Sequence, residues 1–246
     1  EGLILDNMPY QITWLSQGGF LFEYENLRIV ADPYMSDVLS ARGFGRMSPP
    51  PLSYEELKPD WVLFTHDHID HFDETSVSGI CSIYPKCKFA GPQSTMEHFS
   101  KLGFSNEFEL LKKGTPLKFS ESACVIPTPA FHSDQHAVGL LFDFGGKLAW
   151  LSGDTLFDPS LAKSVNELAG GRKISAAMIC INGRLGNMNA QEAAEVISSL
   201  RPELAIPMHF GLFAGNTADP EPFVEALEKE NIKTLVAEAG KPYKIS

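Results

Sequence analysis

Short apolar runs separated by turn-forming residues dominate the first two thirds of the chain and predict β-strands. The first three predicted strands cover residues 11–15, 20–24 and 27–31, and the dipeptides Gly18-Gly19 and Glu25-Asn26 between them are typical of hairpin turns. Further strands are predicted at residues 61–64, 88–90, 108–111, 117–119, 123–127, 137–144 and 147–151.

Helical periodicity enters between these strands and becomes regular toward the end of the chain. Ser53 with Glu56, and Asn189 with Glu192, have the spacing of capping boxes, and each pair predicts the start of a helix. Helices are predicted at residues 73–80, 93–102, 159–169, 190–200 and 220–230, and later strands at residues 175–181, 203–207 and 233–237. Two groups of strands with helices in both halves predict an α/β protein in which two sheets pack together beneath outer helices.

The most informative stretch is WVLFTHDHIDHFDE, residues 61–74, which reads as a buried strand followed by metal-ligand side chains. His66 and His68 are two residues apart, so in an extended segment both imidazoles project to the same side and can share one cation. Asp70 and His71 follow where the chain turns toward the next helix, and we expect them on a second cation beside the first. The alternative interpretation is a surface loop rich in His and Asp. Imidazole and carboxylate ligands without cysteine suit Zn, Mn or Fe.

A metal-ligand side chain also follows three other apolar strands. His132 lies in PTPAFHSD, Asp154 in LSGDT and His209 in IPMHFG. Each residue alone is weak evidence, but their shared placement with the central motif predicts that all three join its cluster. His98 lies inside a predicted helix, and we interpret it as structural. His136, close to His132, is interpreted as a pocket-wall or core residue.

Composition limits the classes of protein that the chain can belong to. With 246 residues, 43% of them hydrophobic and 21% charged, we expect a single domain over residues 1–246. A formal net charge of -11 argues against a nucleic acid partner. No apolar run has the length of a membrane span, and the first ten residues lack the features of a secretory signal, so we expect a soluble cytoplasmic protein. The chain starts with Glu, which leaves its native start open. The four cysteines have no paired or zinc-ribbon spacing and are interpreted as buried thiols in a reducing compartment.

The HxHxDH spacing from His66 to His71, followed in order by His132, Asp154 and His209, resembles the metallo-β-lactamase superfamily. The segments THDHIDHFD and LSGDT, and the run ICINGRLGNMNAQEAAE leading to IPMHF, look like the branch that contains the L-ascorbate-6-phosphate lactonase. The resemblance covers nearly the whole chain. It implies a four-layer αββα sandwich, two mixed sheets flanked by helices, with the metals in a cleft at one edge. The chain is shorter than the sugar lactonase at its start and around the phosphate end of the site, so that substrate is not carried over.

The resemblance also implies how two divalent ions are held. One ion would be bound by His66, His68 and His132, the other by Asp70, His71 and His209, with Asp154 as the bridge between them. Residue types set several relatives aside. The secreted zinc-cysteine β-lactamases use Cys at the position of Asp154, flavin-coupled diiron reductases replace His68 with Glu, and tRNA-processing nucleases need a basic exosite.

This ligand set predicts a dinuclear hydrolase. Two Zn or Mn ions, with Fe possible, would lower the pKa of a shared water toward about 7 and supply a metal-bound hydroxide as nucleophile. Asp70 could orient that hydroxide and accept its proton, which makes it the candidate catalytic residue. Asn182 and Arg184 are candidates for gripping a substrate carboxylate or phosphate, the alternative being a loop-fixing hydrogen bond and a surface charge. Arg42 and Arg46, in the irregular loop 34–52, are weaker candidates, for which a solvated role is favoured.

We expect the substrate to be small and anionic, such as a lactone or a phosphorylated sugar acid. A phosphodiesterase or phospholipase-type hydrolase is the alternative among enzymes. A metal-stabilised binding or sensing domain is the alternative among other proteins. Neither nucleic acid nor a membrane span is expected, and a homo-oligomer is compatible with the sequence.

Overall fold

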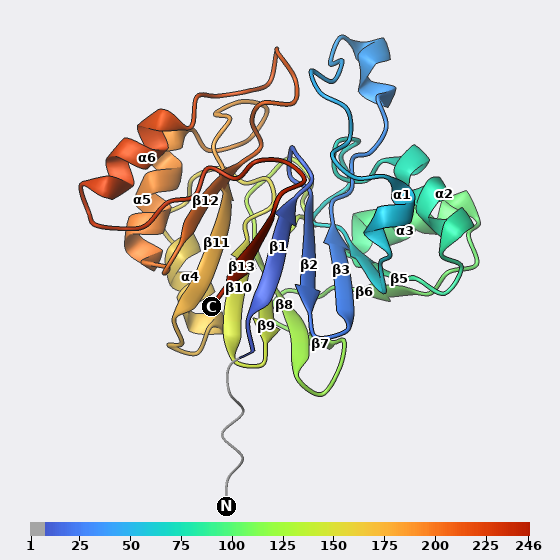
Figure 1. Cartoon of the computed structure of the whole chain (residues 1–246), viewed down its shortest axis with the longest axis horizontal. Helices are drawn as coiled ribbons and strands as arrows, with labels where there is room; N and C mark the ends of the chain where they lie inside the picture. Colours follow the sequence, from blue (N-terminus) through green and yellow to red (C-terminus); the bar gives the residue numbers. More distant parts are fainter. Residues whose placement is uncertain (1–7) are drawn as a thin grey trace, which may run out of the picture.

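The computed structural model describes residues 8–246, which form a sandwich of two β-sheets (Figure 1). Residues 1–7 belong to the predicted domain and to the stretch used to argue against a secretory signal, and they lie outside the described residues. The first sheet has seven strands, in the spatial order β13 (Pro242–Ile245), β1 (Tyr10–Trp14), β2 (Phe20–Tyr24), β3 (Leu27–Ala31), β4 (Trp61–Leu63), β5 (Lys88–Gly91) and β6 (Phe108–Leu110). The second has six, in the order β12 (Ala205–Met208), β11 (Ile174–Cys180), β10 (Lys147–Leu151), β9 (Val138–Phe144), β8 (Ala123–Pro129) and β7 (Leu117–Lys118).

Both sheets are mixed, and each has an antiparallel and a parallel half. In the first sheet the pairs from β13 to β3 are antiparallel and those from β3 to β6 are parallel. In the second, the pairs from β12 to β10 are parallel and those from β10 to β7 are antiparallel. Parallel neighbours need a crossover connection, and helices supply it between most of the parallel pairs.

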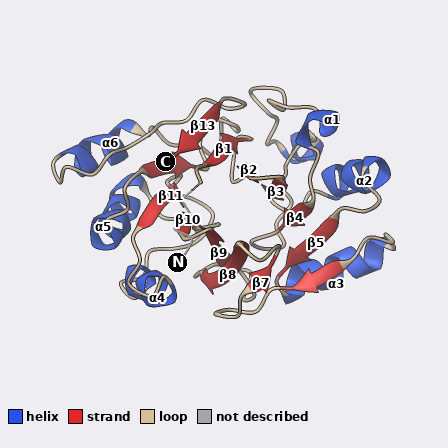
Figure 2. Ribbon diagram, turned by 60° about the horizontal axis from the view of Figure 1, so that its bottom comes forward, coloured by secondary structure: helices blue, strands red, loops and turns tan. Residues whose placement is uncertain are grey.

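The helices cover the outer faces of the two sheets. Figure 2 shows one group beside the first sheet, namely α1 (Tyr54–Leu57), α2 (Glu74–Ile83) and α3 (Gln93–Leu102). The other group covers the second sheet and consists of α4 (Leu161–Leu168), α5 (Ala190–Leu200) and α6 (Glu221–Glu228). A short 3-10 helix, η1 (Val38–Arg42), lies within the long loop between β3 and α1. None of the helices in residues 8–246 combines the length and the apolar character needed to cross a membrane.

Alternating side chains of the first sheet enter two separate apolar cores. Phe22 and Ile29 belong to the core between the sheets, where the ring of Phe22 lies 4.4 Å from that of Phe142 in β9. Leu21 and Val30 point to the other face and pack in a second core with the residues of α1, α2 and α3. This alternation, with a period of two residues, is what a strand covered on both faces requires. The predicted four-layer αββα sandwich is therefore confirmed.

The prediction of a strand at residues 233–237 is wrong. Only Thr234 forms a bridge, to Ala205 of β12, because the segment meets the end of that strand and then leaves the sheet. The last strand is instead β13, which pairs with β1 on the other sheet (Figure 1). β13 begins with Pro242, has only one buried residue, Ile245, and lies at the sheet edge, so its apolar pattern is too weak to predict it.

Five strands end at the same edge of the sandwich, and each is followed by a polar side chain. β4 leads into the HDHIDH loop, while β3, β8, β10 and β12 precede the remaining residues, which are Asp32, His132, Asp154 and His209. Strand ends are rigid because ladder hydrogen bonds fix the backbone on one side. The fold thus assembles residues that are distant in the chain at one place.

Candidate metal centre

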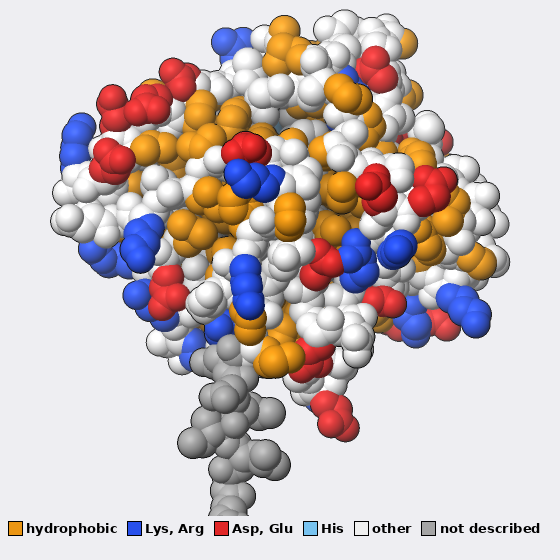
Figure 3. All heavy atoms as spheres, in the orientation of Figure 1, with side chains coloured by type: hydrophobic (Ala, Val, Ile, Leu, Met, Phe, Trp, Pro, Cys, Tyr) orange, Lys and Arg blue, Asp and Glu red, His pale blue; other side chains and the backbone are white. Residues whose placement is uncertain are grey.

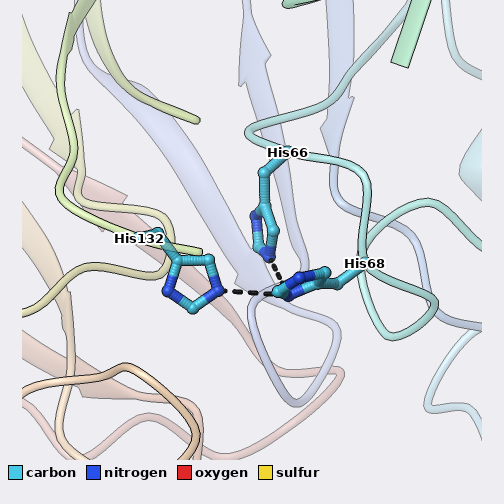
Figure 4. Close-up of side chains that lie close together, drawn as sticks. All are labelled: His66, His68 and His132. Carbon is cyan, nitrogen blue, oxygen red and sulfur yellow. Dashed lines mark hydrogen bonds between the residues drawn. The ribbon is translucent and has the colours of Figure 1, made fainter. Parts of the chain in front are cut away.

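Three histidines form the first group of ligand atoms. Nδ1 of His68 lies 3.1 Å from Nε2 of His66 and 3.1 Å from Nε2 of His132. Figure 4 shows the three rings turned toward one another, His66 and His68 from the loop after β4 and His132 from the loop after β8. Three imidazole nitrogens this close leave room between them for one cation. Three is also the usual number of protein ligands in a catalytic zinc site.

Asp70, His71 and His209 form the second group, and their ligand atoms all lie within 4.8 Å of one another. Nε2 of His71 is 3.3 Å from Nε2 of His209, and Oδ2 of Asp70 is 3.4 Å from the latter atom. Both histidines are buried, whereas Asp70 is half-buried. The second group therefore joins the central loop to the end of β12.

Asp154 lies between the two groups. Its Oδ1 is 3.1 Å from Nε2 of His209 and 3.3 Å from Nε2 of His71, while its Oδ2 is 4.0 Å from Nε2 of His132. The carboxylate is 4% exposed, and its Oδ1 accepts no hydrogen bond from any residue in the described range. A buried carboxylate oxygen without a donor is costly unless a cation faces it. Five imidazoles and two carboxylates fit a pair of divalent transition-metal ions.

Four of the histidines are held by hydrogen bonds on the side away from the other ligand atoms. One is His66, whose Nδ1 lies 2.9 Å from the Thr65 hydroxyl. Nδ1 of His71 donates to Oδ2 of Asp32 over 2.8 Å, and Nδ1 of His132 donates to the carbonyl of Gly186 over 3.0 Å. His68 is reversed, because its Nε2 lies 3.2 Å from the Ser133 hydroxyl and its Nδ1 faces the cluster. Such partners fix the ring tautomer and orientation that metal ligation needs.

Asp32 is a part of the site that sequence reasoning missed. Both of its oxygens accept hydrogen bonds from Thr65, one from the backbone N–H at 2.8 Å and one from the hydroxyl at 2.6 Å. The side chain is fully buried and also accepts a hydrogen bond from Nδ1 of His71. In the sequence, Asp32-Pro33 marks only the end of a strand. The one sign of its role is that Asp32 follows an apolar strand, as the metal-ligand candidates do.

Gln17 and Asn187 hold the two carboxylates and were also missed. Nε2 of Gln17 donates to Oδ2 of Asp70 over 2.8 Å, and Nδ2 of Asn187 donates to Oδ2 of Asp154 over 2.8 Å. Gln17 is fully buried, and its Oε1 has no hydrogen-bond partner among the described residues. Both amides lie in irregular turns, where no periodic pattern identifies them.

A cavity of about 360 Å³ opens beside the ligands. It is lined by Leu39, Arg42, Phe44, Asp67, His68, Ile69, Asp70, Leu185, Phe213 and Asn216. Two metal-ligand candidates, His68 and Asp70, thus contact the space that a substrate would enter. Arg42 is the only Lys or Arg among these lining residues.

The two residues proposed to grip a substrate do not line this cavity. Asn182 is buried, and its amide donates to Asn216 Oδ1 over 2.8 Å and accepts from Asn187 over 3.0 Å. Arg184 is exposed, and its carbonyl accepts a hydrogen bond from the Asn187 backbone. Arg46, the other candidate, donates to the carbonyl of Tyr34 over 2.7 Å. These contacts fix loops.

The remaining histidines lie outside the two ligand groups. The ring nitrogens of His98 lie 2.6 Å from Asp67 and 3.0 Å from Glu74, and the ring stacks on Phe72. It therefore braces the central loop against α2. His136 is exposed, so its interpretation as a core residue is wrong.

The pKa values of several histidines in the cluster depart strongly from the ordinary value of histidine. Burial opposes protonation of His71 and His209, but the carboxylates around them, Asp154 foremost, outweigh it and raise the pKa of His71 well above its ordinary value and that of His209 to about 9. Burial, followed by the charge of His71, lowers the pKa of His66 well below its ordinary value. The carboxylate of Asp154 thus favours positive charge around it, carried by protonated histidines when no metal ion is bound.

Comparisons with known proteins agree with this geometry. The family described as "Beta-lactamase superfamily domain" matches residues 27–210. An UPF0173 protein of Pyrococcus furiosus is 28% identical over 238 residues, which is 95% of this chain and 97% of that protein. An UPF0173 metal-dependent hydrolase of Caldivirga maquilingensis is 28% identical over 239 residues, covering 93% of this chain and 95% of its own.

Among solved structures, Igni18, a metallo hydrolase from Ignicoccus hospitalis, has the same fold. It superposes with a TM-score of 0.81 at 24% identity, covering 97% of this chain and 99% of that one. The family match includes the HDHIDH loop and extends through His132, Asp154 and His209. From the fold, the ligand geometry and this match, we conclude that the chain belongs to the metallo-β-lactamase superfamily.

Proposed function

We propose that the protein is a dinuclear metal-dependent hydrolase of a small carbonyl substrate, with a lactone as the leading class. The observation that carries this proposal is the position of Asp154, whose two oxygens face different groups of ligand atoms. A carboxylate shared in this way is the arrangement that two-metal hydrolytic sites need. The relatives described as metal-dependent hydrolases support the same reading.

When bound, two divalent ions, Zn or Mn with Fe as a further candidate, would lower the pKa of a water toward about 7 and polarise the substrate carbonyl. The chain itself supplies orientation and a proton acceptor. Asp70 lines the cavity, and Gln17 holds one of its oxygens. Its carboxylate is therefore fixed where a nucleophilic water can donate a proton to it. Asp32 keeps Nε2 of His71 directed at the same region.

The charges in the cavity lining support our choice of a lactone over a phosphorylated sugar acid. Arg42 offers one positive charge to the cavity, and Asp67, also in its lining, offers a negative one. A phosphorylated sugar acid carries at least two negative charges, and the single arginine in the lining does not balance them. A neutral or singly charged lactone fits better, and the resemblance to the lactonase branch makes lactones the first class to test.

The test uses the full chain reconstituted with Zn or Mn. We expect hydrolysis of γ-butyrolactone or a substituted lactone that is removed by chelator and falls at least about a hundredfold in His68→Ala while the fold is retained. Faster turnover of bis-p-nitrophenyl phosphate than of every lactone would instead assign the phosphodiesterase alternative. Two bound ions without metal-dependent turnover of either class would contradict the proposal and favour a binding or sensing domain.

A further inference from the structure

We infer that the substrate carries an apolar arm, so that the preferred substrates are esters or lactones with an alkyl or aryl substituent. This inference rests on the proposed hydrolytic function and names the substrate class of the same cavity. The arm would lie against five apolar side chains, namely Leu39, Phe44, Ile69, Leu185 and Phe213.

The first observation is an apolar cluster separate from the two cores of the sandwich. It consists of Tyr34, Leu212 and Phe213, with the partly buried Leu39, Phe44 and Ile69 packed against it. The ring of Phe213 meets those of Tyr34 and Phe44 edge-on, at centroid distances of 5.6 and 6.1 Å. Four of its six members line the cavity. Its remaining apolar surface therefore faces the space beside the metal ligands.

The second observation is the position of Leu185. Its side chain is 68% exposed, the highest value among the large apolar residues that the structure describes. Its φ of +53° lies in the left-handed region, which leucine rarely adopts. Both features cost stability. A strained and exposed leucine at the cavity wall is explained if the side chain contacts a substrate.

The turn that carries Leu185 is fixed to the metal ligands. The N–H of Gly183 donates to the carbonyl of Met188, and the Asn182 amide donates to the carbonyl of Arg184 over 3.2 Å. The carbonyl of Gly186, the residue after Leu185, accepts a hydrogen bond from Nδ1 of His132. Leu185 is thus held at a set distance from the first ligand group, which is what a substrate-positioning residue requires.

The cavity lining combines metal-ligand candidates with apolar side chains. His68 and Asp70 lie at the metal end, and the apolar side chains form most of the remaining lining. A cavity of about 360 Å³ is at the small end of the usual range for ligand sites. A carbonyl group with a short apolar arm matches this combination of metal ligands and apolar side chains.

The first experiment compares γ-octalactone, γ-butyrolactone and glucono-δ-lactone on the metal-loaded protein. We expect kcat/KM for γ-octalactone to exceed that for the other two by at least about tenfold, because the cavity buries the alkyl arm. In Leu185→Ala this ratio falls roughly three- to tenfold, because KM for γ-octalactone rises while its kcat stays the same. Val236→Ala, which shortens another exposed apolar side chain (42% exposed) outside the cavity lining, leaves the ratio as it was.

A binding measurement separates this inference from the proposed function. Calorimetry with hexanoate and acetate, neither of which can be hydrolysed, should give at least about tenfold tighter binding of hexanoate with a negative heat-capacity change. Equal binding of the two acids, or equal kcat/KM for the three lactones, overturns the inference even if hydrolysis is observed. No lactone turnover together with tighter hexanoate binding contradicts the proposed function but supports the apolar site.

Discussion

Oδ2 of Asp32 and Nδ1 of His71 lie 2.8 Å apart, and both side chains are completely buried. The contact joins the end of β3 to the loop after β4, two neighbouring parallel strands of the first sheet. It leaves only Nε2 of His71 to face Asp154 and His209. Asp32 thus decides which nitrogen of His71 is presented to the other ligand atoms.

We predict that Asp32→Asn weakens metal binding about 10- to 100-fold, the usual effect of losing a partner that orients a ligating histidine. The amide keeps the size of the side chain but removes the negative charge that polarises the imidazole. The measurement is a competition for Zn with a chromophoric chelator, with circular dichroism as a check on the fold. Asp219→Asn, at an exposed position, serves as the control. Equal affinities for both variants would show that Asp32 has no orienting role.

Gln17 should act on the rate through Asp70. Gln17→Met preserves the volume and removes the hydrogen bond to Oδ2 of Asp70. The carboxylate then loses its fixed orientation, and we expect kcat to fall about tenfold or more with KM nearly unchanged. Gln135→Met, at an exposed position, is the matched control. A change confined to KM would argue that Gln17 contacts the substrate instead.

Metal uptake should release protons at neutral pH. In the metal-free protein the pKa of His71 lies well above its ordinary value and that of His209 is about 9, so both rings hold a proton at pH 7. A metal ion must displace those protons, so binding tightens as the pH rises toward 9 and weakens toward pH 6. Titration calorimetry in buffers of different ionisation enthalpy should give about two protons released when both ions bind at pH 7. A heat that does not depend on the buffer would contradict this prediction.

The two ligand groups should be separable by mutation. We predict that His132→Ala lowers the metal content from two ions to one, because the first group loses a ligand and the second keeps Asp70, His71 and His209. His136→Ala is a close control, since His136 is four residues away and exposed. Elemental analysis after dialysis counts the ions. Retention of two tightly bound ions in His132→Ala would remove His132 from the site.

Most of the fold and the placement of the ligands followed from strand patterns. Apolar runs ending in His or Asp identified β4, β8, β10 and β12, and the structure brings the side chains that follow them together. These signals are strong because a buried strand excludes polar residues until it ends.

The parts that sequence reasoning missed share a different physical cause. Asp32, Gln17 and Asn187 act through hydrogen bonds made between turns, and a turn has no periodicity that marks which polar residue points inward. For the same reason the sequence pattern did not distinguish Asn182 and Arg184, which do not line the cavity, from Leu185 in the same turn, which does. A short edge strand such as β13 has little apolar surface to reveal it.

The distribution of Lys and Arg on the surface bears on the prediction that the protein has no nucleic acid partner. On the face drawn in Figure 3, Lys and Arg side chains are scattered among acidic and apolar ones rather than joined in a continuous basic stripe. Phosphate backbones are bound by clustered cations. The absence of a nucleic acid partner stays a prediction, which rests on the net charge of -11.

The measurement that tests the central claim most directly is anomalous diffraction from crystals of the protein loaded with Zn or Mn. We predict two peaks in one site, each about 2.0–2.2 Å from its ligand nitrogens or oxygens. One peak would lie among His66, His68 and His132, the other among Asp70, His71 and His209, with Asp154 between them. A single peak, or peaks away from Asp154, would contradict the dinuclear centre and the hydrolytic function built on it.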